Sequence, residues 1–185
     1  MSKVKRLIDS YTSHIFVPWR SGIAAPQRVI FCVYSENDEL QLRYKIGEFR
    51  LATMNAGHEW IVFDVTDSLA EWISEHSYKE SYFKNPELLD LENNPDEFIE
   101  YLSNKFKDYI EINGANENTV VAVSGVGSLF KTVKVRLLVD SFAPLVKGRL
   151  LVLFPGTYNN DTYRLLGASD GWDYLAIPLT ADSNI

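Results

Sequence analysis

The stretch Thr119-Val-Val-Ala-Val-Ser-Gly-Val-Gly-Ser128 decides the fold of this 185-residue chain. Its first five residues form an unbroken run that predicts a buried strand, and the small residues that follow favour a tight turn. Residues 133–145 then have helical spacing. A second unbroken apolar run, residues 150–154, ends at Pro155-Gly156. Continuous apolar strands separated by helices are typical of a parallel sheet with helices on both faces.

The rest of the chain continues this alternation. Further strands are expected at residues 27–34, 60–65 and 172–179, with a short strand or turn at 161–166. Helices are expected at residues 2–16, 68–76 and 96–112, and after Ser35 or Asn37, where one apolar stripe comprises Leu40, Tyr44, Gly47, Leu51 and Met54. We therefore predict an α/β fold: a three-layer sandwich with a mostly parallel central sheet flanked by helices. It would be P-loop-NTPase-like or Rossmann-like, but without a working P-loop. Residues 1–185 would form a single domain, with residues 77–114 as a helical insertion-like segment.

Composition narrows the function classes. The formal net charge of −7 argues against a long basic face that grasps nucleic acid, so any contact with nucleic acid is expected to be indirect. The single cysteine, Cys32, lies inside an apolar run and predicts a buried reduced thiol, which excludes a disulfide framework. The sequence contains neither a signal peptide nor an apolar run long enough to span a membrane. We expect a cytoplasmic protein with no membrane partner.

The Gly-rich loop is the first candidate binding site. Gly125-Val-Gly-Ser-Leu-Phe-Lys-Thr132 differs by one residue from the P-loop pattern, because Phe130 replaces the second glycine while Lys131 and Thr132 keep their places. A bulky residue at that position prevents the backbone from curling around a phosphate. We favour a structural turn, although weak anion binding by backbone N–H groups stays open. The candidate docking residues here are Ser124, Gly125, Gly127, Ser128 and Lys131.

The loop after the second apolar run is the other candidate. Pro155, Gly156, Thr157 and Tyr158 follow this strand, and Arg164 comes shortly afterwards. An exposed Tyr158 beside Thr157 would contact a partner or an anion. The alternative is that Pro155 and Gly156 turn the chain while Tyr158 covers the end of the core.

No catalytic set or metal site is predicted, and no cofactor is expected. The histidines are far apart in sequence, and neither Ser124 nor Ser128 falls in a nucleophile motif. Asp64, at the end of a strand, is interpreted as a turn or cap residue in preference to a metal ligand. Lys131, Lys134 and Arg136, together with Lys147 and Arg149, predict one local basic cluster, and contact between that cluster and DNA stays open.

Two motifs together resemble a known family. The segment Val123-Ser-Gly-Val-Gly-Ser-Leu-Phe130, a helix, then Leu150-Leu-Val-Leu-Phe-Pro-Gly-Thr-Tyr158 and Arg164-Leu-Leu166 are similar to the C-terminal half of the BrxB family. That family is the small B component of BREX phage-defence systems and is described as a domain of unknown function. The specific motifs lie in residues 120–166, while the N-terminal half matches only in its β-α-β pattern.

The resemblance implies a bacterial antiviral role beside a methyltransferase, a large ATPase and a PglZ-like protein of the alkaline phosphatase family. It implies a non-catalytic adaptor that acts through protein–protein contacts, most plausibly with the PglZ-like protein. Two alternatives stay open: a nucleotide- or phosphate-binding enzyme that uses residues 124–132, and a direct nucleic-acid binder.

Overall fold

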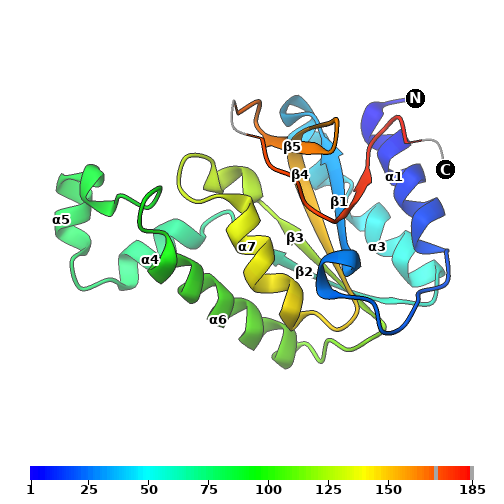
Figure 1. Cartoon of the computed structure of the whole chain (residues 1–185), viewed down its shortest axis with the longest axis horizontal. Coiled ribbons are helices and arrows are strands. Elements are labelled where there is room, and N and C mark those ends of the chain that lie inside the picture. Colours follow the sequence, from blue (N-terminus) through cyan, green and yellow to red (C-terminus); the bar gives the residue numbers. More distant parts are fainter. Residues whose placement is uncertain (169–170, 184–185) are drawn as a thin grey trace.

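Two buried strands, β1 (Val29–Tyr34) and β4 (Arg149–Asn159), run parallel in the middle of the sheet (Figure 1). The computed structural model describes residues 1–168 and 171–183. Within them the strand order is β2-β3-β4-β1-β6, all parallel, and β5 pairs antiparallel with the end of β4. The other strands are β2 (Glu59–Asp64), β3 (Thr119–Ser124), β5 (Thr162–Leu165) and β6 (Ile177–Leu179). The predicted α/β fold with a mostly parallel sheet is confirmed.

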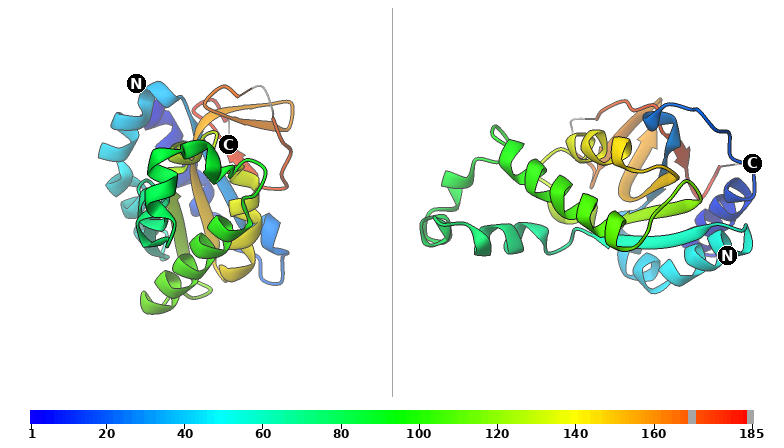
Figure 2. Two further views of the ribbon diagram at one scale, coloured as in Figure 1. Left: turned by 90° about the vertical axis from the view of Figure 1, so that its left-hand side faces the viewer. Right: turned by 90° about the horizontal axis from the view of Figure 1, so that it is seen from below.

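Helices cover both faces of this sheet (Figures 1 and 2). The α-helices are α1 (Lys3–Ile15), α2 (Glu39–Tyr44), α3 (Ile46–Asn55), α4 (Ser68–Glu75), α5 (Lys79–Lys84), α6 (Asp96–Ile112) and α7 (Val135–Phe142). The short 3-10 helices are η1 (Ala25–Arg28), η2 (Glu36–Asp38), η3 (Pro86–Leu89), η4 (Val126–Leu129) and η5 (Ala143–Leu145). Helices α1 and α3 pack on one face, and α6 and α7 pack on the other.

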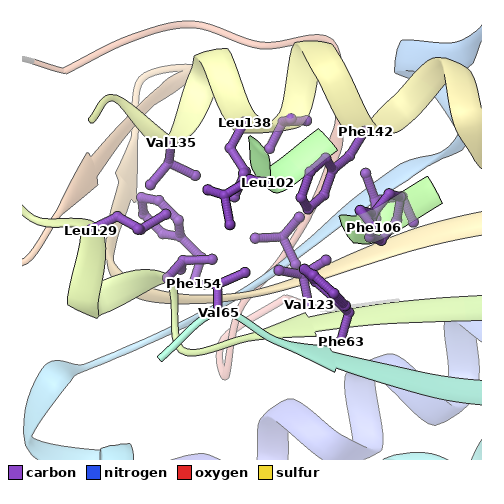
Figure 3. Close-up of a cluster of buried hydrophobic side chains, with 14 of the residues drawn as sticks. Phe63, Val65, Leu102, Phe106, Val123, Leu129, Val135, Leu138, Phe142 and Phe154 are labelled. Carbon is purple, nitrogen blue, oxygen red and sulfur yellow. The ribbon is translucent and has the colours of Figure 1, made fainter. Parts of the chain in front are cut away.

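The larger core lies between the sheet and the α6–α7 layer (Figure 3). Helix α6 spans the predicted residues, and its buried positions Phe98, Leu102, Phe106 and Ile110 recur at helical spacing. The rings of Phe106 and Phe142 stack with centroids 3.9 Å apart, which joins α6 to α7. Helix α6 is therefore part of the sandwich, and only the first part of the predicted insertion 77–114 leaves it.

That part forms a projection, which we call the helical arm and define as residues 75–97. It contains α5 and η3 and extends away from the sheet in Figure 1 and in the right view of Figure 2. Leu91 is buried in the core and anchors the base of the arm. The arm is therefore attached to the core through Leu91, while its outer part makes little contact with the sandwich.

Three predicted boundaries were wrong. Strand β4 does not end at Pro155 but continues to Asn159, because it pairs with β5 through Gly156 and Thr157. Helix α7 begins at Val135, since residues 131–134 form an extended turn instead. The predicted strand 172–179 shortens to β6, while Trp172 makes a single bridge to Tyr163.

Candidate functional site

The Gly-rich loop closes directly onto the end of β2. Gly125 has a φ of +81°, and a Cβ placed there would lie 2.2 Å from Thr66 Oγ1 and 2.6 Å from Asp64 Oδ1. Only glycine tolerates both this conformation and this approach. Ser128 then donates from Oγ to the Gly125 carbonyl, at 2.8 Å, and to the Val65 carbonyl, at 3.3 Å. The loop ties the end of β3 to the end of β2.

Three backbone donors of this loop bond to carbonyls of the same loop. The N–H groups of Ser128, Phe130 and Thr132 donate to the carbonyls of Gly125, Gly127 and Leu129, in that order. Phe130 is extended, with φ −56° and ψ 129°, and Lys131 takes the left-handed conformation with φ +58°. These N–H groups are already used, and α7 starts several residues later. These three bonds, and the distance along the chain to α7, favour the structural turn over a phosphate cradle.

The Pro155–Tyr158 segment is a strand rather than a turn. A Cβ at Gly156 would lie 2.0 Å from the Arg164 carbonyl oxygen, so glycine permits the close pairing of β4 with β5. Thr157 is exposed, and Tyr158 donates from its hydroxyl to Asp161 Oδ1 at 2.8 Å. Arg164 lies opposite Thr157 on β5, and its Nη1 donates to the Ala168 carbonyl.

Only some of the candidate docking residues therefore lie close together in the structure. Gly127 approaches Pro155, with 3.2 Å between a built Cβ and Pro155 Cγ, so the two loops meet at the carboxyl edge of the sheet. Lys131 instead lines a pocket of about 320 Å³ at the base of the helical arm. That pocket is bordered by acidic arm residues, namely Glu87, Asp90 and Glu92.

The predicted basic cluster is divided between the two edges of the sheet. Lys131 and Lys134 follow the carboxyl end of β3, whereas Lys147 and Arg149 stand at the amino end of β4. Arg136 lies 3.7 Å from Asp140 and 3.9 Å from Asp173, which neutralises its charge. A continuous basic face is not formed by these residues.

A polar network at the carboxyl edge was missed by the sequence analysis. Arg43 on α2 donates from Nε to Glu39 Oε1 at 2.6 Å and from Nη2 to Thr66 Oγ1 at 2.9 Å. The Tyr34 hydroxyl donates to Glu39, and burial, followed by this hydrogen bond, raises the pKa of Tyr34. Asp64 Oδ1 accepts from the Thr66 N–H, as expected of a turn residue. The members are mutually paired, so the network fixes η2 and α2 onto the sheet.

The predicted stripe on α2 and α3 faces solvent. Leu40, Tyr44, Leu51 and Met54 are between 54% and 89% exposed, and Gly47 is exposed too. The buried face of these helices carries Leu42, Phe49, Ala52 and Thr53 instead. Exposed large apolar side chains at helical spacing are a feature of protein-binding faces. We call Leu40, Tyr44, Gly47, Leu51 and Met54 the α2–α3 stripe.

The helical arm exposes a second apolar set. Tyr78, Phe83 and Leu88 are between 57% and 68% exposed. The same segment is acidic, with two lysines, Lys79 and Lys84, against seven carboxylates: Glu75, Glu80, Glu87, Asp90, Glu92, Asp96 and Glu97. The α2–α3 helices pack in the core on the α1 side of the sheet, whereas the arm is anchored through Leu91 in the core on the α6–α7 side.

Among residues 1–168 and 171–183, no group of three or more His, Cys, Asp or Glu side chains is placed to hold a metal ion. None of the helices in the same residues is long and apolar enough to cross a membrane. Comparisons with protein-family models, with curated proteins and with solved structures gave no match to this chain.

Proposed function

We propose that this chain is a non-catalytic, cytoplasmic adaptor of a BREX bacteriophage-resistance system. It would act through protein–protein contacts, with the PglZ-like protein as the first partner and the large ATPase or the methyltransferase as the other candidates. The motifs of residues 120–166 support the system, and the helical arm supports the mode of action.

The helical arm is the observation that carries this proposal. It exposes three large apolar side chains to water. A partner that covered them would gain about 25 cal/mol of binding free energy for each Å² of apolar surface removed from water. Its excess of carboxylates repels acidic proteins and attracts a basic one. We therefore expect the partner to offer a basic surface with an apolar groove that receives Phe83 and its neighbours.

The α2–α3 stripe provides a second, separate surface. The stripe belongs to the helices on one face of the sheet and the arm is anchored in the core on the other face. Two separate apolar surfaces suit a protein that holds two components together, as an adaptor does.

Co-purification tests the proposal. The chain is expressed with each of the three BREX proteins, and complex formation is measured by size-exclusion chromatography. We expect a complex with the PglZ-like protein that Phe83→Ser weakens at least tenfold, because a large exposed apolar side chain at the centre of an interface contributes most of its binding energy. Phe16→Ser is the matched control, since Phe16 is also about half exposed but lies outside both surfaces.

Three outcomes would contradict the proposal. The first is a chain that forms no complex with any of the three proteins. The second is an equal loss of binding in Phe83→Ser and Phe16→Ser. The third is saturable binding of ATP or GTP measured by calorimetry, which would favour the nucleotide-binding enzyme. Against that alternative, three N–H groups of residues 124–132, those of Ser128, Phe130 and Thr132, bond within the loop.

A further inference from the structure

Two arginines lie side by side at the amino edge of the sheet. Arg28 immediately precedes β1 and Arg149 begins β4, and the register that pairs Val29 with Leu150 makes the two arginines neighbours. Arg149 projects toward the α1 side, because Leu151, two residues further along β4, belongs to the core on that side. Arg149 is only 8% exposed.

Neither guanidinium has an acidic partner within the described part of the chain. There Arg149 donates one hydrogen bond, from Nη1 to the Gly148 carbonyl at 3.2 Å, and Arg28 Nε is a buried donor without an acceptor. The carboxylate of Glu59, two strands away, is occupied by Asn116 and Thr119, each at 2.8 Å.

An unpaired guanidinium pair is costly to bury. Arginine stays protonated in proteins, so it loses hydration without becoming neutral. Burial, and then the charge of Arg28, lower the pKa of Arg149. Arg28 is only partly buried, but two like charges this close to each other are stabilised by an anion that contacts both guanidiniums.

Aromatic packing holds Arg149 in place. Its Cζ lies 4.5 Å from the centroid of the Trp19 ring, and that ring stacks on His58 with centroids 3.7 Å apart. On α1, burial and then the charge of Arg149 lower the pKa of His14, which favours its neutral form. The guanidinium is thus ordered before any ligand arrives, which reduces the entropy cost of binding.

We infer that Arg28 and Arg149 form a binding site for a phosphate dianion, at the edge of the sheet opposite the Gly-rich loop. A phosphate monoester or inorganic phosphate carries nearly two negative charges, which match the two arginines, and its oxygens suit the fork of a guanidinium. A monocarboxylate neutralises only one of them. The site is independent of the docking surfaces of the proposed adaptor.

Thermal unfolding in inorganic phosphate, compared with chloride at equal ionic strength, tests this site. For the wild-type chain we expect the Tm to rise saturably, by roughly 5–10 °C when phosphate is about one hundredfold above its Kd. Arg28→Gln removes that rise but does not lower the Tm in chloride, because the repulsion has gone. Arg149→Lys keeps the charge but loses the fork, and weakens phosphate binding in calorimetry. Acetate gives a smaller rise than phosphate.

The matched control is Arg20→Gln, which removes the same charge from an exposed arginine in the loop beside Trp19. It keeps the full phosphate-dependent rise. The inference is overturned by a wild-type Tm that is the same in phosphate and chloride, or by an equal loss of the rise in Arg20→Gln and Arg28→Gln. It is also overturned if Arg28→Gln lowers the Tm in chloride, which would mark Arg28 as a structural residue. Binding to the BREX partners is measured separately and is unchanged in Arg28→Gln.

Discussion

Gly125 lies so close to Thr66 that a Cβ at residue 125 would stand 2.2 Å from the Thr66 hydroxyl oxygen. Its φ of +81° adds a second reason for glycine. We predict that Gly125→Ala lowers the free energy of unfolding by about 2–4 kcal/mol, from backbone strain and the clash together. Urea denaturation measures it. Gly57→Ala is the control, because its φ is +85° with no atom near a new Cβ, and it should cost about 1 kcal/mol.

The Phe106–Phe142 stack holds the α6–α7 layer together (Figure 3). Both rings are fully buried, so Phe106→Ala should lower the free energy of unfolding by about 3–5 kcal/mol. Phe83→Ala removes the same group from the exposed arm and should change it by less than about 0.5 kcal/mol. Equal losses in the two variants would contradict the assignment of core and arm.

Cys32 should be inert in the folded chain. Its side chain is fully buried in β1, and burial raises the pKa of the thiol, which suppresses the reactive thiolate. A thiol reagent added to the native protein at neutral pH should label Cys32 slowly, at a rate limited by the opening of the folded chain. Prompt stoichiometric labelling without denaturant would show that β1 is accessible and would contradict the sheet order.

Stability should fall in alkaline solution. Burial, only partly offset by the hydrogen bond to Thr53, raises the pKa of Tyr11 above the ordinary tyrosine value of 10.0. The folded chain keeps this phenol neutral while the unfolded chain ionises it, so its contribution is present below pH 10 and is lost as pH rises toward the raised pKa. From pH 9 upward, the free energy of unfolding should fall less steeply with pH in Tyr11→Phe than in the wild-type chain, as measured by denaturation. The exposed Tyr44→Phe should decline like the wild-type chain.

Binding of the partner to the helical arm should depend on salt. The carboxylates of the arm are at the surface, where charge interactions are screened over about 8 Å at physiological ionic strength. The association rate should therefore fall as salt increases, while the apolar contacts of Phe83 chiefly set the dissociation rate. Surface plasmon resonance at several salt concentrations separates the two rates. A rate of association that does not change with salt would exclude acidic steering.

Much of the fold could be predicted because the strands are continuous apolar runs. The β3 and β4 runs are buried on both faces, and α6 has a strongly periodic apolar face. The end of β4 could not be predicted, because Pro155 and Gly156 usually punctuate a chain. Here Gly156 allows close pairing with β5, which depends on a partner distant in sequence.

The orientation of α2 and α3 was the main failure in locating surfaces. Both faces of residues 39–55 carry apolar side chains, and periodicity alone cannot choose between them. The buried face includes Thr53, whose hydroxyl bonds to Tyr11 on α1 at 2.6 Å. A polar residue whose hydrogen-bond partner lies on a distant helix has no local signature, so the pattern singled out the stripe that faces solvent and not the buried face.

The pairing of Arg28 with Arg149 could not be predicted from the sequence, for a related reason. Arg28 and Arg149 are far apart in sequence, and only the parallel register of β1 and β4 brings them together. Proximity along the chain grouped Arg149 with Lys131 instead, although these two residues stand at opposite edges of the sheet. The order of the strands in the sheet decides which charged side chains become neighbours, and local sequence patterns do not encode that order.

Hydrogen exchange of the chain with and without the PglZ-like protein tests the adaptor account most directly. The account predicts slower exchange in residues 75–97 on complex formation, centred on Tyr78 and Phe83, with residues 124–132 unchanged. Protection confined to residues 124–132 and 155–158, with the helical arm unaffected, would contradict it.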